Sequence, residues 1–329
     1  MPKIGIIGAG SWGCALALLL YKNGNQVTVW SALADEIAYL AENLEHPALT
    51  GVKIPDDMLL TTSLTDAVNG MDFLILAVAS PYVRATAKKL NEFVKPGQII
   101  VNVAKGIEEA TLFTMSEIIE EEVPQAKVAV LSGPSHAEEV GRGIPTTIVV
   151  GARENETAEY LQNIFMSEVF RVYSNHDVMG IELGAAMKNV VALAAGIADG
   201  LGYGDNSKAA LITRGIAEIA RLGAAMGCKT ETFYGLSGIG DLIVTCASAH
   251  SRNRRAGILI GQGKSMEEAM KEVKMVVEGV YSAKAGLSLA QKYNITTPII
   301  EQVNAVLFAG KEPAFAVKEL MLRDKKAED

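Results

Sequence analysis

Three glycines near the start of the chain have the spacing of a dinucleotide-binding turn. Gly8, Gly10 and Gly13 follow the apolar, β-branched run 4–7 and precede the apolar run 14–20. In a strand, turn and helix of this order, the first glycine permits the tight turn and the second lets the backbone approach a pyrophosphate. The third lets the helix pack on the strand. The helix start then offers N–H groups and a positive dipole end to the anion. We therefore predict a dinucleotide site, although glycines with this spacing also occur in other turns.

One lysine stands alone in a long apolar segment with a helical pattern, residues 179–198. A lysine buried there is disfavoured in its charged form, and its pKa falls toward the range useful for proton transfer. The lysine is Lys188, with Asn189 beside it and the small residues Gly184 and Ala185 near the same face. We interpret Lys188 as catalytic. The alternative is a side chain that extends along the helix to solvent.

Polar and turn residues follow several candidate strands. Lys105 comes directly after the apolar run 99–104, while Ser80-Pro81 and Gly133-Pro134-Ser135 follow two other runs. Because ligands of open α/β sheets bind beyond the carboxyl ends of the strands, these residues are candidate ligand contacts. The alternative, which stays open for Ser80-Pro81, is an ordinary strand-to-helix turn.

A cationic cluster lies near the start of a helical segment in the second half of the chain. Ser251 can cap that helix, and Arg252 and Asn253 then lie at its positive dipole end, as in a phosphate site. The alternative is a solvated basic face, above all for Arg254 and Arg255. Upstream, the glycine-rich segment 235–241 ends in Asp241, which could act in the site or only cap a helix.

The remaining pattern predicts an α/β fold in two domains. Strand-like runs occupy 26–30, 58–61, 73–79, 98–103, 127–131, 146–150 and 169–173. Helical segments at 35–44, 82–93 and 112–121 separate several of them, which predicts a mostly parallel, doubly wound Rossmann-type sheet. Only helical patterns follow, at 179–198, 206–226, 252–262, 265–271, 282–292, 299–307 and 313–322. We place a dinucleotide-binding domain at 1–175 and an all-α C-terminal domain at 176–329.

Composition excludes several classes of protein. The 329 residues are 49% hydrophobic and 21% charged, which is typical of a soluble globular protein. A formal charge of −8 disfavours nucleic acid, and no uninterrupted apolar stretch has the length of a membrane span. No secretory signal is visible. Three separated cysteines and four scattered histidines argue against a metal site and for a reducing compartment, so we expect a cytoplasmic protein.

The end of the second predicted strand bears on the choice of cofactor. An acid there usually binds the adenosine ribose of NAD, and an arginine accepts the extra phosphate of NADP. Ser31, Ala32 and Leu33 supply neither, and Asp35 is expected to cap the next helix. We therefore expect use of both NAD and NADP, with kcat/KM values within about tenfold of each other.

Taken together, these motifs resemble those of bacterial NAD(P)-dependent glycerol-3-phosphate dehydrogenases. The resemblance runs from about residue 3 to about residue 322, and segments 132–140, 209–223 and 246–257 are the most specific. It implies reversible hydride transfer between NAD(P)H and dihydroxyacetone phosphate, giving sn-glycerol 3-phosphate for phospholipid synthesis. It also implies a homodimer, with no nucleic acid partner, no membrane insertion and no metal.

The resemblance further implies residue roles. Lys188 resembles the proton donor to the substrate carbonyl, and the catalytic set would be Lys188, Lys105 and Asp241. The substrate contacts would be Lys105, Gly133, Ser135, Lys188, Asp241, Ser251, Arg252 and Asn253. The cofactor contacts would be Gly8, Gly10, Ser11, Trp12, Gly13, Lys105, Ala137, Arg252, Val276 and Glu278. The last two lie in segment 275–279, where pattern alone predicts only a turn. Many members of the family have His or Arg where this chain has Ala32 and Leu33.

Three other functions are alternatives to this one. A hydroxyacid or sugar-acid dehydrogenase of similar design often has an Asn one helical turn after the lysine, where this chain has Ala192. A non-catalytic dinucleotide sensor would not need Lys188. A structural oligomer would require the glycine turn to be accidental.

Overall fold

The computed structural model describes residues 1–325 and 327, and its contacts divide the chain into two compact units. The first unit comprises Met1–Lys105 and Phe113–Glu182, and the second comprises Gly106–Leu112 and Leu183–Asp329. The change of unit therefore falls inside a long helix. The domain boundary near residue 175 stays a prediction.

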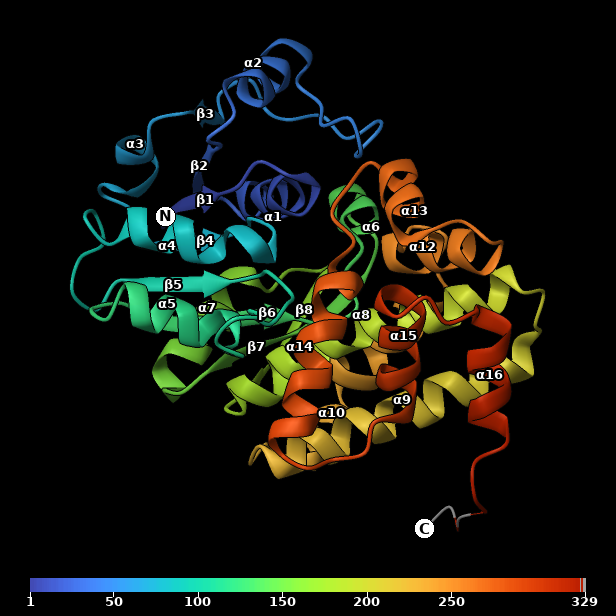
Figure 1. The fold of residues 1–329 in the computed structure, drawn as a ribbon. Helices are drawn as coiled ribbons and strands as arrows, with labels where there is room; N and C mark the ends of the chain where they lie inside the picture. The colour runs from blue at the N-terminus through green and yellow to red at the C-terminus, as the bar shows by residue number, and fades with distance from the viewer. Residues whose placement is uncertain (326, 328–329) are drawn as a thin grey trace. The chain divides into compact units, whose positions relative to one another are not determined.

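The first unit is built on an eight-stranded sheet with the order β3-β2-β1-β4-β5-β6-β7-β8 (Figure 1). Every neighbouring pair is parallel except β6 and β7, which are antiparallel, and this confirms the mostly parallel α/β sheet. The strands are β1 (Lys3–Ile7), β2 (Gln26–Trp30), β3 (Leu59–Thr61), β4 (Phe73–Leu76), β5 (Ile99–Asn102), β6 (Lys127–Ser132), β7 (Thr146–Ala152) and β8 (Phe170–Asn175).

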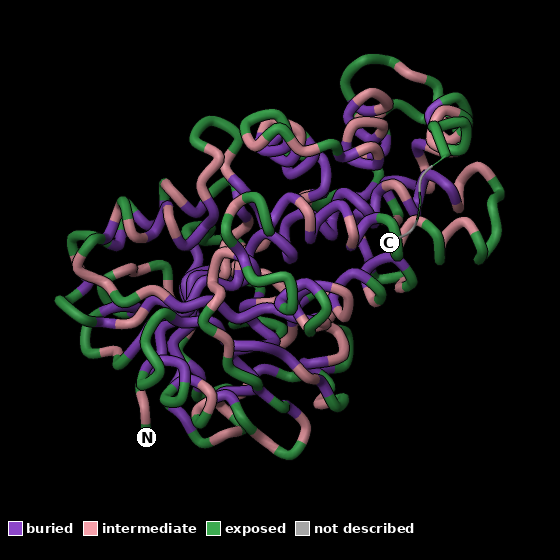
Figure 2. Tube along the Cα trace, turned by 90° about the horizontal axis from the view of Figure 1, so that it is seen from below, coloured by how far each residue is buried: buried purple, intermediate pink, exposed green. Residues whose placement is uncertain are grey.

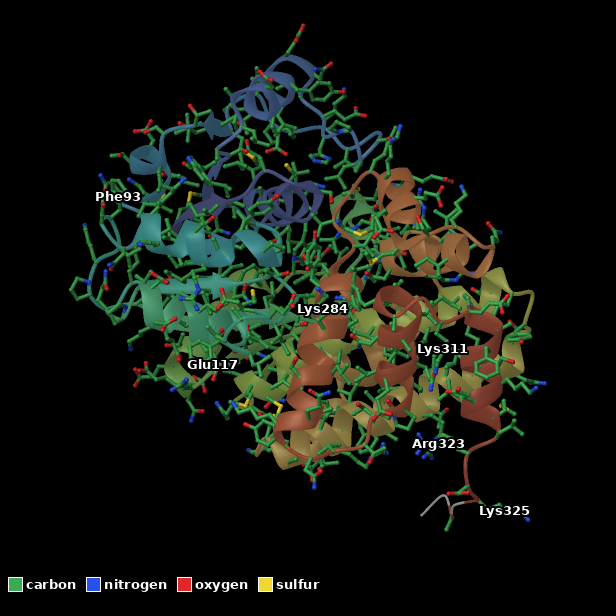
Figure 3. The ribbon with its side chains drawn as sticks, in the orientation of Figure 1. Phe93, Glu117, Lys284, Lys311, Arg323 and Lys325 are labelled. Atoms are coloured by element: carbon green, nitrogen blue, oxygen red, sulfur yellow. The ribbon has the colours of Figure 1, made fainter. Side chains whose placement is uncertain are left out.

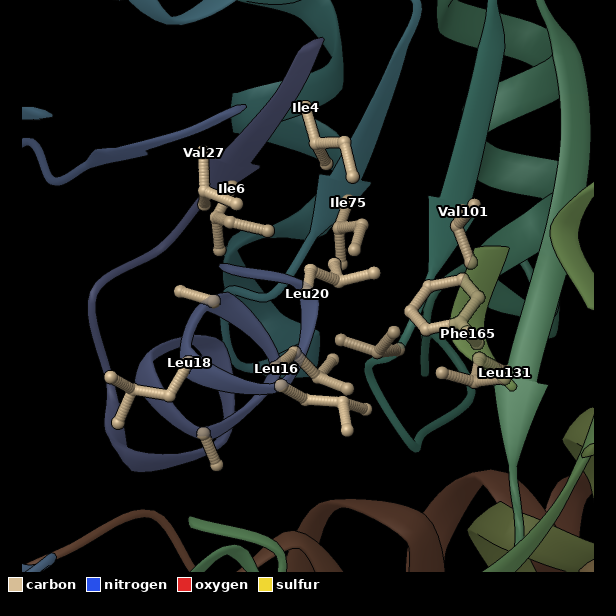
Figure 4. Close-up of a cluster of buried hydrophobic side chains, with 14 of the residues drawn as sticks. Ile4, Ile6, Leu16, Leu18, Leu20, Val27, Ile75, Val101, Leu131 and Phe165 are labelled. Carbon is tan, nitrogen blue, oxygen red and sulfur yellow. The ribbon is translucent and has the colours of Figure 1, made fainter. Parts of the chain in front are cut away.

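Helices cover both faces of this sheet because successive strand residues point to opposite sides. Phe73 and Ile75 of β4 join a buried cluster with α1 and α7, and Figure 4 shows part of that cluster. Leu74 and Leu76 join a second cluster with α4 and α5. The helices of this unit are α1 (Ser11–Lys22), α2 (Ala34–Asn43), α3 (Leu64–Val68), α4 (Val83–Leu90), α5 (Met115–Glu122), α6 (Ala137–Arg142) and α7 (Asn155–Phe165).

In the second unit, every secondary-structure element formed by the described residues is helical. Helix α8 (Val178–Gly200) enters it from the first unit, and a short wide turn, η2 (Leu236–Gly240), precedes α11. The other helices are α9 (Asp205–Ala225), α10 (Thr230–Phe233), α11 (Asp241–Ala247), α12 (Arg252–Gly261), α13 (Met266–Val273), α14 (Glu278–Lys292), α15 (Pro298–Phe308) and α16 (Pro313–Met321). In Figure 2 buried stretches run through the interior and the loops are largely exposed.

Helix α8 is long and apolar enough to cross a membrane, but its most apolar stretch is entirely buried inside the protein. The core helix of a globular protein has the same composition, so α8 is weak evidence for a membrane span.

The segment Gly106–Leu112 is held to the helical unit by α14. Lys284 Nζ lies 3.7 Å from Glu109 Oε1 and 4.8 Å from the ring centroid of Phe308 in α15, and its position is labelled in Figure 3. The contact between Lys284 and Glu109 explains why Gly106–Leu112, a short loop after Lys105, belongs to the second unit.

A carboxylate is buried where α8 begins. Glu182 is 2% exposed, and its oxygens accept hydrogen bonds from Asn102 Nδ2 at 2.7 Å and from the Ser116 backbone N–H at 3.1 Å. Burial raises the pKa of Glu182 to about 7, although these hydrogen bonds oppose the rise. The folded chain therefore keeps a proton that the unfolded chain releases above its ordinary pKa of 4.5.

This difference predicts a pH dependence of stability. Between about pH 4.5 and pH 7 the folded state binds more protons, so the free energy of unfolding falls as the pH rises. We expect Glu182→Gln to reduce this decrease in the free energy of unfolding by about 3 kcal/mol, at about 1.4 kcal/mol per unit of pKa difference. Denaturant unfolding below pH 4.5 and above pH 7 measures how much the free energy of unfolding changes between the two. The exposed Glu92→Gln variant is the control, and an unaltered pH dependence in Glu182→Gln would show that the carboxylate is already ionised in the folded state.

Candidate active site

The glycine turn after β1 has the geometry that a dinucleotide requires. Gly8 has φ +129°, and a Cβ on it would lie 2.6 Å from the Ala77 carbonyl oxygen. A Cβ on Gly13 would lie 2.0 Å from the Gly8 carbonyl oxygen, so only glycine lets α1 pack against the turn. At Gly10 a Cβ would meet nothing within 4 Å, which leaves open space above the turn. The turn therefore has room for a ligand at the start of α1.

The start of α1 is suited to an anion. Gly10 is the N-cap, no side chain caps the helix, and its first turn contains no acid. The helix begins with Ser11 and Trp12, and the buried indole Nε1 of Trp12 has no hydrogen-bond partner among the described residues. Backbone N–H groups and the helix dipole thus face open space, which fits the pyrophosphate of a nicotinamide dinucleotide.

The adjacent parallel strands β5 and β6 bring a second group of predicted residues together. Lys105 Nζ donates to the Gly133 carbonyl oxygen at 3.2 Å, and Ser135 Oγ donates to the same oxygen at 2.9 Å. Ala137 follows as the first residue of α6 and is buried. Ser80 begins a short 3₁₀ helix ahead of α4.

In the second unit, Lys188 is buried and paired. It is 5% exposed, so the alternative of a side chain reaching solvent is wrong. Its Nζ donates to Asp241 Oδ1 at 2.5 Å and to Thr245 Oγ1 at 2.7 Å. The carboxylate favours the charged ammonium and so opposes the loss of the proton that burial alone would favour. Two hydrogen bonds therefore fix the position of Nζ.

Asp241 begins a helix rather than capping one. The glycine-rich segment predicted as a turn forms η2, and Asp241 is the first residue of α11, whose N-cap is Gly240. The interpretation of Asp241 as a cap is therefore wrong, because its side chain binds Lys188 instead. Thr245 lies one helical turn further on and donates to the Asp241 carbonyl oxygen at 2.6 Å. Sequence reasoning did not find Thr245.

The start of α12 is capped and anchored by its own first residues. Ser251 Oγ accepts from the Arg254 backbone N–H at 3.2 Å, as predicted for an N-cap. Asn253 Nδ2 donates to Asn189 Oδ1 at 2.8 Å, and Asn253 Oδ1 accepts from the Gly279 backbone N–H at 2.8 Å. Asn253 therefore ties the start of α12 to the residue after Lys188 and to the start of α14.

The arginines of α12 have different environments. Arg254 Nε donates to Asp199 Oδ2 at 2.7 Å, so its interpretation as part of a solvated face is wrong. Arg255 is exposed. Arg252 is half-buried and makes no ion pair with any residue that the structure describes. It therefore remains the cation at this helix start that is suited to a ligand.

The segment around Val276 contains more helix than predicted. Helix α14 begins at Glu278, whereas the sequence pattern predicted a start at Ser282. Val276 is half-buried in the connection that leads into α14. The contact between Gly279 and Asn253 places this helix start beside that of α12.

Glycines set the distance between α8 and α12. A Cβ on Gly196 would lie 2.1 Å from the Arg254 carbonyl oxygen, and one on Gly257 would lie 2.3 Å from the Leu193 carbonyl oxygen. The backbones of α8 and α12 are therefore in direct contact. In α12 this contact includes Gly257, which lies five residues after Arg252. This contact fixes the helix that carries Arg252 against the helix that carries Lys188.

We expect Gly257→Ala to destabilise the protein by about 1–3 kcal/mol, because the added methyl group must push the two backbones apart. The same shift should raise the KM for a phosphorylated substrate more than the KM for the nucleotide. Thermal unfolding and steady-state kinetics measure both effects. Gly204→Ala is the control, because a Cβ there would meet nothing within 4 Å. Equal behaviour of the two variants would contradict a tight α8–α12 contact.

No group of metal-ligating side chains occurs among residues 1–325 and 327. The three cysteines are buried, and burial raises the pKa of Cys14 and of Cys246 to about 12. Neither of these two thiols is therefore suited to act as a nucleophile.

The glycine turn and the uncapped start of α1 on a doubly wound sheet define a dinucleotide-binding protein. The sequence profile described as "NAD-dependent glycerol-3-phosphate dehydrogenase N-terminus" matches residues 3–158, and the corresponding C-terminus profile matches residues 177–318. The chain belongs to the NAD-dependent glycerol-3-phosphate dehydrogenase family.

Individual relatives agree with this assignment. The chain is 62% identical to "Glycerol-3-phosphate dehydrogenase [NAD(P)+]" of Agathobacter rectalis, over 100% of this chain and 98% of that protein. It is 61% identical to the protein of the same name from Fusobacterium nucleatum, over 100% of this chain and 99% of that one. The crystal structure of glycerol-3-phosphate dehydrogenase from Coxiella burnetii has 35% identity and a TM-score of 0.94, covering 98% of this chain and 99% of that one.

A hydroxyacid dehydrogenase shares the architecture at a greater distance. The structure of D-mandelate dehydrogenase with NADH and anilino(oxo)acetate is 16% identical, with a TM-score of 0.65 over 98% of this chain and 100% of that one. This likeness shows a common fold and does not favour a hydroxyacid substrate.

Proposed function

We propose that this protein catalyses reversible hydride transfer between NAD(P)H and dihydroxyacetone phosphate, giving sn-glycerol 3-phosphate. The observation that carries the proposal is the buried Lys188, hydrogen-bonded to Asp241 and Thr245, in a chain of this family. Reduction of a ketone needs a proton donor at the carbonyl oxygen, and a fixed ammonium group provides one. The product would feed glycerophospholipid synthesis.

The nicotinamide, when bound, supplies or accepts the hydride. Lys188 Nζ donates a proton to the carbonyl oxygen as negative charge develops there, and it takes the proton back in the reverse direction. Asp241 and Thr245 accept hydrogen bonds from Nζ and so fix its orientation. Asp241 also stabilises the ammonium form that donation requires. Its role is therefore to orient and tune Lys188.

The substrate phosphate would be held by the start of α12. Its backbone N–H groups and the positive end of the helix dipole attract a dianion, and Arg252 adds a full charge. Ser251 and Asn253 would contact the substrate, and both also fix this helix start in place. Lys105, Gly133 and Ser135 are proposed as further substrate contacts on the first unit.

The dinucleotide would be held mainly by the glycine turn. Gly8, Gly10 and Gly13 shape the turn, and Ser11 and Trp12 provide the first N–H groups of α1. We propose these five residues as cofactor contacts. Lys105, Ala137, Arg252, Val276 and Glu278 complete the proposed set.

A steady-state assay with dihydroxyacetone phosphate and either NADH or NADPH tests the proposed function. We expect oxidation of the reduced nucleotide that depends on the phosphorylated ketone, and the reverse reaction with sn-glycerol 3-phosphate. Pyruvate and oxaloacetate are the control substrates, and turnover of either one in preference to the phosphorylated ketone would contradict the proposal.

We also propose a cytoplasmic homodimer that does not insert into membranes. Sedimentation velocity of the purified chain should give twice the monomer mass, and fractionated cells should contain the protein in the soluble fraction. A monomer, or protein recovered with the membranes, would contradict this.

A further inference from the structure

The loop after β2 contains an acid that the sequence pattern did not place there. Ser31 Oγ donates to Glu36 Oε2 at 2.5 Å, and Glu36 lies in the first turn of α2. The expectation that no acid reaches the end of this strand is therefore wrong. The expectation that Asp35 caps α2 is also wrong, because the N-cap is Leu33 and Asp35 lies within the helix.

The hydrogen bonds of Ser31 leave it nothing to donate. Its hydroxyl has one proton, which goes to Glu36, while its oxygen accepts from the Leu33 backbone N–H at 3.1 Å. Ser31 is 5% exposed and held in this arrangement. Segment 31–36, SALADE, contains no Lys or Arg. The loop therefore presents a carboxylate and lacks the cation that a phosphate would need.

Glu36 is also close to the nucleotide-binding end of α1. Its negative charge adds to the burial that raises the pKa of Cys14, which lies in the first turn of α1. Burial lowers the pKa of His46, and the charges of Glu36 and Glu138 oppose that effect. Glu36 therefore acts as a negative charge on groups of both α1 and the segment after α2.

We propose that Glu36 makes this enzyme prefer NADH to NADPH, by accepting a hydrogen bond from the adenosine ribose 2′-hydroxyl and repelling a 2′-phosphate. The proposal rests on the proposed function and deepens it by naming the cofactor that the site prefers. A carboxylate at the end of the second strand is complementary to a ribose diol. A phosphate dianion beside it would place like charges together, and segment 31–36 supplies no compensating cation. NADPH remains usable at higher concentration.

The test is equilibrium binding of NADH and NADPH, measured by nucleotide fluorescence without substrate. We expect the wild type to bind NADH at least tenfold more tightly than NADPH. Glu36→Gln keeps an acceptor for Ser31 but removes the charge, and it should reduce the ratio to about threefold or less, mainly by tightening NADPH. Glu42→Gln, an exposed acid on the same helix, is the matched control and should leave the ratio unchanged.

A second measurement does not depend on the variants. Because the proposed repulsion is Coulombic, raising the salt concentration from about 0.02 M to about 0.5 M should reduce the preference of the wild type for NADH over NADPH. A wild-type ratio near one, or a Glu36→Gln ratio equal to that of the wild type, would overturn the proposal. If Asp35→Asn changed the ratio of the two nucleotide affinities and Glu36→Gln did not, the preference would be due to Asp35, and the proposal would be wrong.

The same binding data separate this proposal from the proposed function. If NADH binds with the expected preference but dihydroxyacetone phosphate is not reduced, the cofactor inference stands and the substrate assignment fails. If dihydroxyacetone phosphate is reduced equally well with both nucleotides, the substrate assignment stands and the cofactor inference fails.

Discussion

Replacing Lys188 by alanine is expected to lower kcat for dihydroxyacetone phosphate reduction by about 10²–10⁴-fold, the usual contribution of a general acid. The physical reason is that Nζ is the buried cation that Asp241 and Thr245 hold in place. NADH binding should change little, because Lys188 belongs to neither the glycine turn nor the start of α1. Steady-state kinetics and nucleotide fluorescence together measure the two effects.

The exposed Lys271→Ala variant is the control for loss of a positive charge in the same unit. If Lys188→Ala kept more than about a tenth of the wild-type rate, the lysine would position the substrate rather than donate a proton. Removing Lys188 also takes the positive charge away from the buried Asp241, so thermal unfolding should accompany the kinetics to show that the variant is folded.

The second large effect is expected for Arg252→Ala. Loss of the partner of a desolvated phosphate costs about 2–5 kcal/mol, which lowers kcat/KM for dihydroxyacetone phosphate by roughly 30-fold to several thousand-fold. The KM for the nucleotide should change less. Comparison with unphosphorylated dihydroxyacetone isolates the phosphate, because wild type and variant should use that poor substrate equally.

Arg255→Ala is the matched control, since it removes the same charge from an exposed position of the same helix. Wild-type activity of Arg252→Ala on the phosphorylated substrate would refute the phosphate site at the start of α12.

The parts of the site that the sequence could predict are local. The glycine turn depends on residues within one strand, turn and helix, so its spacing was sufficient to predict Gly8, Gly10 and Gly13. Lys105 was predicted because it directly follows a buried strand. Ser251 was predicted because an N-cap is read from the residue type and the helix that follows it.

The contacts between helices could not be predicted in this way. Lys188 and Asp241 are far apart in the sequence, and whether they meet depends on how α8 and α11 pack. The glycine-rich stretch before Asp241 has low helix propensity, so the pattern indicated a turn where tertiary packing forms η2 and α11. Thr245 was missed for the same reason, since a threonine in an apolar run carries no local signal of its partner.

Glu36 shows a different limit. A ribose-binding acid is usually found directly at the end of the second strand, whereas Glu36 comes later, inside α2. A helix turn brings it back to Ser31, so an acid five positions along the chain reaches the strand end. The helix α7 was also overlooked, although Ala158, Leu161 and Phe165 are buried at helical spacing.

The single antiparallel strand pair in the sheet also separates the loops of the first unit between two opposite edges. Because β7 runs against β6 and β8 runs parallel to β7, the carboxyl ends of the last two strands open at the edge opposite the glycine turn. Side chains that follow β7 and β8 therefore lie away from the edge where Gly8, Lys105 and Gly133 gather. For protein engineering, this makes the turn after β7 a place in this unit at which an inserted tag or fused domain should leave catalysis intact. The connection after β8 is unsuitable, because it leads directly into α8, which carries Lys188.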